Sequence, residues 1–138
     1  MGRSLIAIFF AVISSQVFAM DSLLDLNWKN RVVLVFGDTD DRKLAEQVVI
    51  LQRQKSELDD RDMIVIRVSK DNADTVYGKA PALKADVLRN EAGIEGYGFH
   101  LVLVGKDGGI KLRSEQVVSD VEMFDLIDRM PMRRAGKS

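Results

Sequence analysis

Two short apolar segments on either side of a helical pattern constrain the fold of this chain more than any other feature. Residues 32–36 are all apolar and mostly β-branched, and residues 63–68 repeat that composition around a single arginine. Such runs are typical of parallel strands that helices cover on both faces of a sheet. Residues 42–58 between them carry apolar side chains at helical spacing, so the whole segment predicts a β-α-β unit with a right-handed crossover. The positions expected to face the sheet are Leu44, Val48, Leu51 and Leu58, and those expected to face away from it are Lys43, Glu46, Gln47, Arg53 and Lys55.

The segment that follows predicts a loop, a helix and an antiparallel pair of strands. Residues 69–78 are expected to form a polar loop. A helix is expected from Pro81 to Arg89, because proline suits a first helical turn. Residues 99–104 predict a third apolar strand. The dipeptide Asp107-Gly108 then predicts a tight hairpin turn into a half-exposed edge strand at residues 110–113.

A last helix is predicted near the end of the chain. Ser119 and Glu122 have the spacing of a capping box, and Pro131 is expected to end the helix. The apolar stripe of this helix is expected to consist of Val121, Phe124, Ile127 and Met130. In chain order, these elements predict an α/β fold with the arrangement β-α-β-α-β-β-α, in which helices flank a four-stranded mixed sheet.

The first nineteen residues have the pattern of an export signal. The positive residue Arg3 precedes the apolar residues 5–13, and the side chains of Val17 and Ala19 are small enough for the cleavage site of a signal peptidase. The apolar run is shorter than the roughly 20 residues that span a bilayer. We therefore expect cleavage after Ala19, a periplasmic or secreted protein, and no membrane insertion afterwards. The expected boundaries are 1–19 for the signal peptide, 20–30 for a lead-in, 31–133 for the domain and 134–138 for a flexible tail.

Composition excludes several classes of function. None of the 138 residues is cysteine, which excludes a disulfide framework, a cysteine-ligated metal site and a thiolate nucleophile supplied by this chain. The formal net charge of −1 lacks the basic footprint of a nucleic-acid-binding protein. We therefore expect neither thiol oxidoreductase activity nor a nucleic-acid partner.

The predicted order of elements resembles the thioredoxin-like arrangement. Beyond topology, four segments resemble an uncharacterised bacterial family of short secreted thioredoxin-like domains, which is itself similar to the domain of equarin and of the sushi-repeat extracellular-matrix proteins. The four segments are Trp28 with Arg31, residues 61–63, residues 103–113 and residues 127–133. The resemblance implies the fold and an extracytoplasmic location, but it implies no activity.

The resemblance also locates where a redox site would lie in this chain. In thioredoxin-like enzymes, the reactive cysteines lie where the loop after the first strand meets the first helix. Residues 37–44 occupy that place here and carry aspartates instead. Such enzymes usually place a cis-proline just before the third strand, where this chain has Gly96-Tyr97-Gly98. Both halves of the redox site are therefore missing from the sequence.

These two segments are expected to meet at one edge of the fold. We expect that edge to contact a protein partner in the cell envelope, which would make the domain a non-catalytic binding or structural module. No catalytic residue is assigned. The binding edge, as the term is used below, consists of Asp38, Thr39, Asp40, Asp41, Tyr97 and His100.

The acidic loop also allows a second hypothesis. Ca²⁺ and Mg²⁺ prefer several carboxylate oxygens, so Asp38, Asp40 and Asp41 could form a divalent-cation site or serve a weak cation-dependent enzyme. Acidic residues before a helix are also ordinary N-caps, and the spacing of a calcium-binding loop is incomplete here. The sequence therefore favours caps and no cofactor. The only histidine, His100, is expected to pack within or at the rim of the sheet rather than to act as a base.

Overall fold

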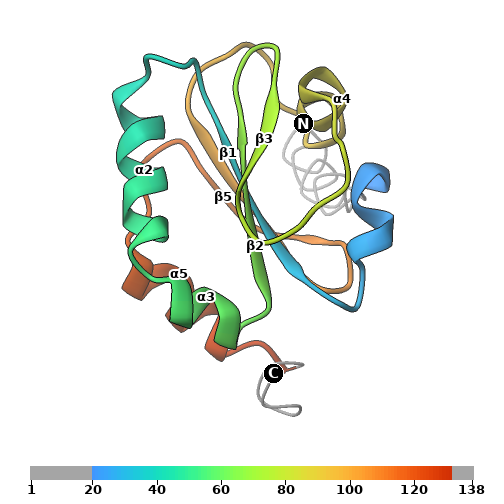
Figure 1. Ribbon diagram of the computed structural model, residues 1–138, viewed down its shortest axis with the longest axis vertical. Helices are drawn as coiled ribbons and strands as arrows, with labels where there is room; N and C mark the ends of the chain where they lie inside the picture. The colour runs from blue at the N-terminus through green and yellow to red at the C-terminus, as the bar shows by residue number, and fades with distance from the viewer. Residues whose placement is uncertain (1–19, 132–138) are drawn as a thin grey trace, which may run out of the picture.

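The computed structural model describes residues 20–131, and a five-stranded mixed sheet in the order β3-β2-β1-β4-β5 lies at its centre (Figure 1). Helices cover both faces of this sheet. The elements in chain order are η1 (Asp21–Leu26), β1 (Arg31–Phe36), α2 (Arg42–Gln52), α3 (Lys55–Asp60), β2 (Met63–Val68), β3 (Ala73–Tyr77), α4 (Ala85–Glu91), β4 (His100–Val104), β5 (Ile110–Ser114) and α5 (Asp120–Asp128).

The central strand β1 is buried along its whole length. It pairs in parallel with β2 and antiparallel with β4, so that Phe36 lies opposite both Val68 and His100. A strand in this position contacts helices on both faces, which explains its unbroken apolar sequence. The predicted β-α-β unit is confirmed, and so is the antiparallel pair formed by β4 and β5.

Two hydrophobic clusters lie on opposite faces of the sheet. Helices α2, α3 and α5 cover one face, and η1 and α4 cover the other (Figure 1). Because successive strand side chains point to opposite faces, β1 supplies Val33 and Val35 to the first cluster and Val32, Leu34 and Phe36 to the second. The predicted inward positions of the first helix are all buried in the first cluster, namely Leu44, Val48, Leu51 and Leu58.

The prediction of a polar loop over residues 69–78 is wrong, because Ala73–Tyr77 form the strand β3. This strand pairs antiparallel with β2 and lies at the edge of the sheet, where its side chains are exposed or only partly buried. An edge strand of this kind needs no apolar run, and the sequence signal is correspondingly weak. The sheet therefore has one strand more than predicted.

The first helix differs from its prediction in two respects. The expected helix over residues 42–58 is interrupted at Gln54, whose backbone leaves the helical region (φ −117°, ψ 44°) and whose Nε2 donates to Asp120 Oδ2 at 2.8 Å. Gln47 was expected to face away from the sheet, and this is wrong because the residue is fully buried. Its side-chain amide makes two hydrogen bonds to the backbone of Val118, which satisfies the polar group inside the core.

The later helices agree with prediction in type and differ in detail. Helix α4 begins at Ala85 rather than Pro81, because the residue before it is extended (φ −108°, ψ 130°). Helix α5 has the predicted cap, since Ser119 Oγ accepts a hydrogen bond from the backbone N–H three residues later. Val121 was expected in the apolar stripe but is exposed, and Met123 is buried in its place.

The predicted signal peptide, residues 1–19, and the predicted tail, residues 134–138, lie outside the described residues. Within residues 20–131, every helix is too short or too polar to cross a membrane.

Candidate binding edge

The loop after β1 leads directly into a capped helix. Asp41 is the N-cap of α2, and its Oδ1 accepts hydrogen bonds from Lys43 N at 2.8 Å and from Leu44 N at 3.3 Å. Such a cap satisfies backbone amides that have no partner within the helix. The expectation that an aspartate caps this helix is therefore met by Asp41. The carboxylate occupies the helix start at which a redox enzyme of this fold would carry its thiols.

We expect Asp41→Ala to lower the free energy of unfolding by about 1 kcal/mol, because the variant loses a side-chain N-cap. Urea denaturation followed by circular dichroism measures this change. The matched control is Asp40→Ala, since Asp40 is a neighbouring exposed aspartate outside the cap, and its effect should stay within about 0.5 kcal/mol. Equal losses in both variants would contradict the assignment of Asp41 as the cap.

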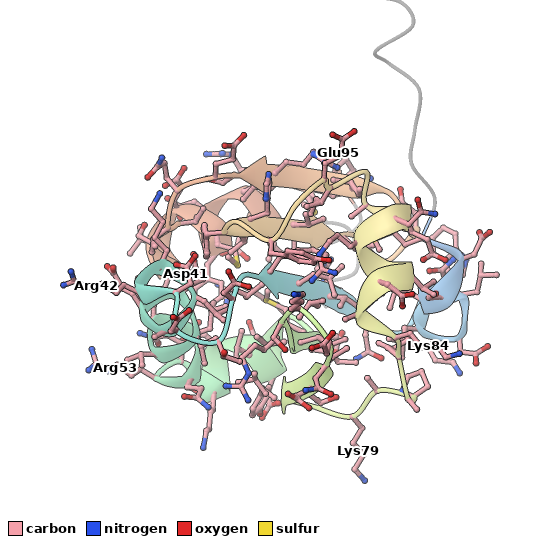
Figure 2. The ribbon with its side chains drawn as sticks, turned by 90° about the horizontal axis from the view of Figure 1, so that it is seen from above. Asp41, Arg42, Arg53, Lys79, Lys84 and Glu95 are labelled. Atoms are coloured by element: carbon pink, nitrogen blue, oxygen red, sulfur yellow. The ribbon has the colours of Figure 1, made fainter. Side chains whose placement is uncertain are left out.

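The other residues of the acidic loop face a second loop. Asp38, Thr39 and Asp40 are exposed and line a hollow of about 370 Å³ together with Ser69–Asn72, the segment between β2 and β3. Lys70 belongs to that segment and brings a positive charge to the hollow. Figure 2 looks onto this edge of the molecule, with Asp41 at the start of α2 and the neighbouring Arg42 side chain pointing away from the domain.

Asp41 and His100 are brought together in a separate hollow of about 390 Å³. His100 begins β4 next to the end of β1, and its side chain is partly buried, as expected for a histidine at the rim of the sheet. The Nδ1 atom lies 3.4 Å from Gly98 O, and Nε2 lies 3.9 Å from Glu115 Oε2. Lys43 Nζ also reaches this hollow and donates to Glu115 O at 3.2 Å.

Tyr97 connects the turn before β4 to the loop after β2. The residue is 44% exposed, and the guanidinium carbon of Arg89 lies 4.7 Å and Lys70 Nζ 5.2 Å from the ring centroid. Arg89 is only 7% exposed, and its Nη2 donates to Ser69 O at 2.7 Å. Among residues 20–131, no hydrogen-bond partner reaches its buried Nε. Tyr97 is therefore an exposed ring held in place by two cations.

Arg89 and Lys70 were not predicted as members of this edge. Lys70 lies in a segment expected to be a polar loop, and Arg89 was assigned only to the end of a helix. The sequence spacing of these residues does not predict a contact with Tyr97, because the contact forms only when α4 packs against the sheet. A lone arginine at the end of an amphipathic helix is the one signal that the sequence offered.

The three aspartates of the loop do not converge on a common point. Within residues 20–131, no group of three or more carboxylate or histidine side chains is arranged to hold a metal ion. One oxygen of Asp41 is also engaged by the backbone amides of α2. The geometry of the described residues thus offers the cation hypothesis no support beyond the composition of the loop.

Comparisons with known proteins identify the fold and a family. A family model described as a domain of unknown function (DUF4174) matches residues 22–136. A solved structure titled thioredoxin peroxidase I, from Plasmodium yoelii, is similar with a TM-score of 0.60 and 16% sequence identity, over 84% of this chain and 81% of that chain. At this identity the similarity shows the fold alone, and it confirms the predicted thioredoxin-like fold class. No curated protein matches the chain.

Proposed function

Because the chain belongs to the DUF4174 family, a domain of unknown function, its role has to be argued from its own residues, and we propose that it is a non-catalytic thioredoxin-fold module that binds a protein partner. The binding edge defined above, extended by Lys70 and Arg89, is the surface that we assign to this partner. The proposal includes export to the periplasm or beyond, with the partner in the cell envelope.

One observation carries the proposal, namely the exposed ring of Tyr97 fixed above the buried Arg89. Tyrosine and arginine are enriched among the residues that dominate protein interfaces. A ring already held by two cations loses little conformational freedom when a partner covers it, and this favours affinity. Since Tyr97 lies between glycines in a turn, a partner can approach it closely.

The surroundings of Tyr97 are suited to a polar partner surface. Asp38 and Asp40 place two negative charges on one side of Lys70, while Arg89 and Lys70 place two positive charges against the ring. Charges of both signs around an aromatic residue determine how a partner is oriented more than how tightly it binds. The lack of any cysteine supports a binding role over thiol chemistry on this edge.

The finer predictions rest on the sequence alone. The cleavage after Ala19 and the resulting export depend on residues outside the described part of the chain. The similarity to equarin and to the sushi-repeat proteins, and the bacterial origin, also remain predictions. The divalent-cation alternative at Asp38, Asp40 and Asp41 stays a prediction from composition, and no contact in the described residues favours it.

Photo-crosslinking at single positions tests the proposal. A photoreactive amino acid placed at Thr39 or at Tyr97 is expected to give the same discrete protein adduct when the chain is expressed in its native cell envelope. Both positions are exposed and lie on the binding edge. Denaturing electrophoresis and mass spectrometry identify the adduct.

The matched control is Arg53, which is also exposed but lies just past the opposite end of α2. No adduct of the same mass is expected from this position. A second check is Arg89→Met combined with the probe at Thr39, which should reduce the adduct because it removes the cation beneath Tyr97. Adducts of equal yield from all three positions, or none from Thr39 and Tyr97, would overturn the proposal.

A further inference from the structure

A cavity of about 450 Å³ lies at the end of the molecule opposite the binding edge. The start of β1, the turn between β4 and β5, and the end of α5 form its walls. The binding edge lies at the other end of β1, by the start of α2 (Figure 1). The volume is within the range of small-molecule sites, which is about 300–1,000 Å³.

One side of this cavity carries hydrogen-bond donors. Arg31 is 1% exposed and Lys106 is 9% exposed, and both line the cavity together with Lys111. Arginine and lysine side chains donate hydrogen bonds and cannot accept them. Lys106 Nζ donates to Asp62 Oδ2 at 2.8 Å in an ion pair, and an ammonium group carries three N–H donors in all.

The carboxylate of Asp107, which also lines the cavity, is already engaged. Its Oδ1 accepts from Gly109 N and its Oδ2 from Lys111 Nζ, both at 2.9 Å. Partial burial acts to raise the pKa of Asp107, but these hydrogen bonds outweigh it and hold that pKa below its usual value. The carboxylate is therefore ionised at neutral pH and paired with Lys111. The cavity lining still carries an excess of positive charge, because Arg31, Lys106 and Lys111 are three cations against the single carboxylate of Asp107.

The opposite side of the cavity is apolar. Leu126, Met130 and Pro131 form this wall, from α5 and the residues just after it. None of these side chains is a strong hydrogen-bonding group, so an apolar body is the part of a ligand that they stabilise. The cavity thus combines cationic donors with an apolar wall.

The walls of this cavity are fixed by contacts between distant segments. Trp28 N donates to Lys106 O at 2.6 Å, and Arg31 Nη1 donates to Arg61 O at 2.8 Å. Arg61 Nε in turn donates to Asp128 Oδ1 at 3.0 Å, which ties the end of α5 to the start of β2. A site whose side chains are held before binding requires little reorganisation to accept a ligand.

We propose that this cavity binds a small monocarboxylate with an apolar body. The carboxylate accepts charge-assisted hydrogen bonds from Lys106 and Lys111, and the apolar body lies against Leu126 and Met130. A carboxylate suits cationic donors better than a neutral acceptor does, because charge-assisted hydrogen bonds are about twice as strong. The site is independent of the binding edge and does not require the function proposed for it.

Calorimetric titration of the full chain with octanoate, below its micellar concentration, tests the proposal. Saturable binding is expected, at least about tenfold tighter than that of octan-1-ol or octylamine, because only octanoate supplies an anionic acceptor. Acetate is expected to bind too weakly to measure, since it lacks the apolar body. Backbone amide signals of Gly105, Lys111 and Met130 should shift on addition of octanoate, while that of Tyr97 should not.

Two variants and one matched control locate the site. Lys106→Met keeps an unbranched side chain of similar length but removes the ammonium group, and it should weaken octanoate binding at least about tenfold. Lys84→Met makes the same chemical change at an exposed lysine before α4, and it should leave the affinity unchanged (Figure 2). If Lys106→Met fails to fold, Leu126→Asp at the partly buried opposite wall should abolish binding through charge repulsion.

The melting temperature of each variant confirms that it is folded before titration. Three results would overturn the proposal: no saturable binding of octanoate, binding of octan-1-ol as tight as that of octanoate, or an unchanged octanoate affinity in a folded Lys106→Met or Leu126→Asp variant.

Discussion

Replacement of Arg61 by alanine is expected to lower the free energy of unfolding by about 3 kcal/mol, because this buried side chain joins α3 to α5. Its Nε and Nη2 donate to the two carboxylate oxygens of Asp128 at 3.0 Å and 2.9 Å. Its Nη1 donates to Glu57 Oε1 at 2.8 Å and to the Glu57 backbone oxygen at 3.0 Å. The guanidinium carbon also lies 4.4 Å from the centroid of the Phe124 ring.

The loss in Arg61→Ala has more than one source. Asp128 and Glu57 are partly exposed, so water can hydrate their carboxylates after the substitution, and the charges themselves are not stranded. The larger part of the effect is expected from the lost packing on Phe124 and from the bidentate geometry that only arginine provides. Burial acts to lower the pKa of Arg61, but the hydrogen bonds to Asp128 and Glu57 outweigh it, so the pKa is raised and the cation is retained.

Urea denaturation of Arg61→Ala, Arg61→Lys and Arg53→Ala measures these contributions. Arg61→Lys keeps the charge but not the fork of donors, and an intermediate loss is expected. Arg53 is exposed, so its replacement should change the free energy of unfolding by less than about 0.5 kcal/mol. A loss in Arg61→Ala as small as that in Arg53→Ala would contradict the structural role assigned to Arg61.

The central part of the fold was predictable because its signals are local. The apolar run of β1, the apolar run of β2 and the helical spacing between them each lie within a few residues of sequence, and burial on both faces of the sheet produces all three. The helix that begins after Asp41 and the helix that begins after Ser119 were predictable for the same reason, since a cap lies within three residues of the amides that it satisfies.

The strand β3 was not predicted because its formation depends on pairing with β2 rather than on the pattern of its own side chains. Residues 73–77 contain polar and apolar side chains without alternation, and they form a strand because the free edge of β2 supplies hydrogen bonds. An edge position places little demand on the side chains, so the sequence shows little of it. The same reasoning explains why the four predicted strands are present in the sheet while the fifth was not predicted.

Only the parts of the candidate sites that follow from the arrangement of the strands could be predicted. The arrangement of the first and third strands placed Asp41 and His100 near each other, and the structure brings them into one hollow. The position of Arg89 beneath Tyr97 depends on how α4 packs, which no spacing in the sequence encodes. The cavity lined by Arg31 and Lys106 likewise combines segments more than 70 residues apart.

Replacement of Gln47 by leucine is expected to lower the free energy of unfolding by about 2–4 kcal/mol, although the sequence pattern assigns this residue to the surface. Gln47 is fully buried on α2, and its Nε2 donates to Val118 O at 2.9 Å while its Oε1 accepts from Val118 N at 2.8 Å. The amide thus pairs with both backbone groups of one residue, as a neighbouring strand would. Leucine is similar in size but leaves both groups buried without partners, and each unsatisfied group costs about 1–3 kcal/mol.

The control for this prediction is Gln52→Leu, which makes the same change at an exposed position of α2 and should shift the free energy of unfolding by less than about 0.5 kcal/mol. Hydrogen exchange separates a lost hydrogen bond from a general loss of stability. Under native conditions the Val118 amide should exchange much faster in Gln47→Leu, while the Met123 amide, which donates to Ser119 O within α5, should follow the global stability alone. Equal acceleration at Val118 and Met123 would mean that Gln47 contributes only through packing. In the expected outcome, the Gln47 side chain supplies the hydrogen bonds that a neighbouring strand would give to Val118, and it thereby positions α5 on the sheet.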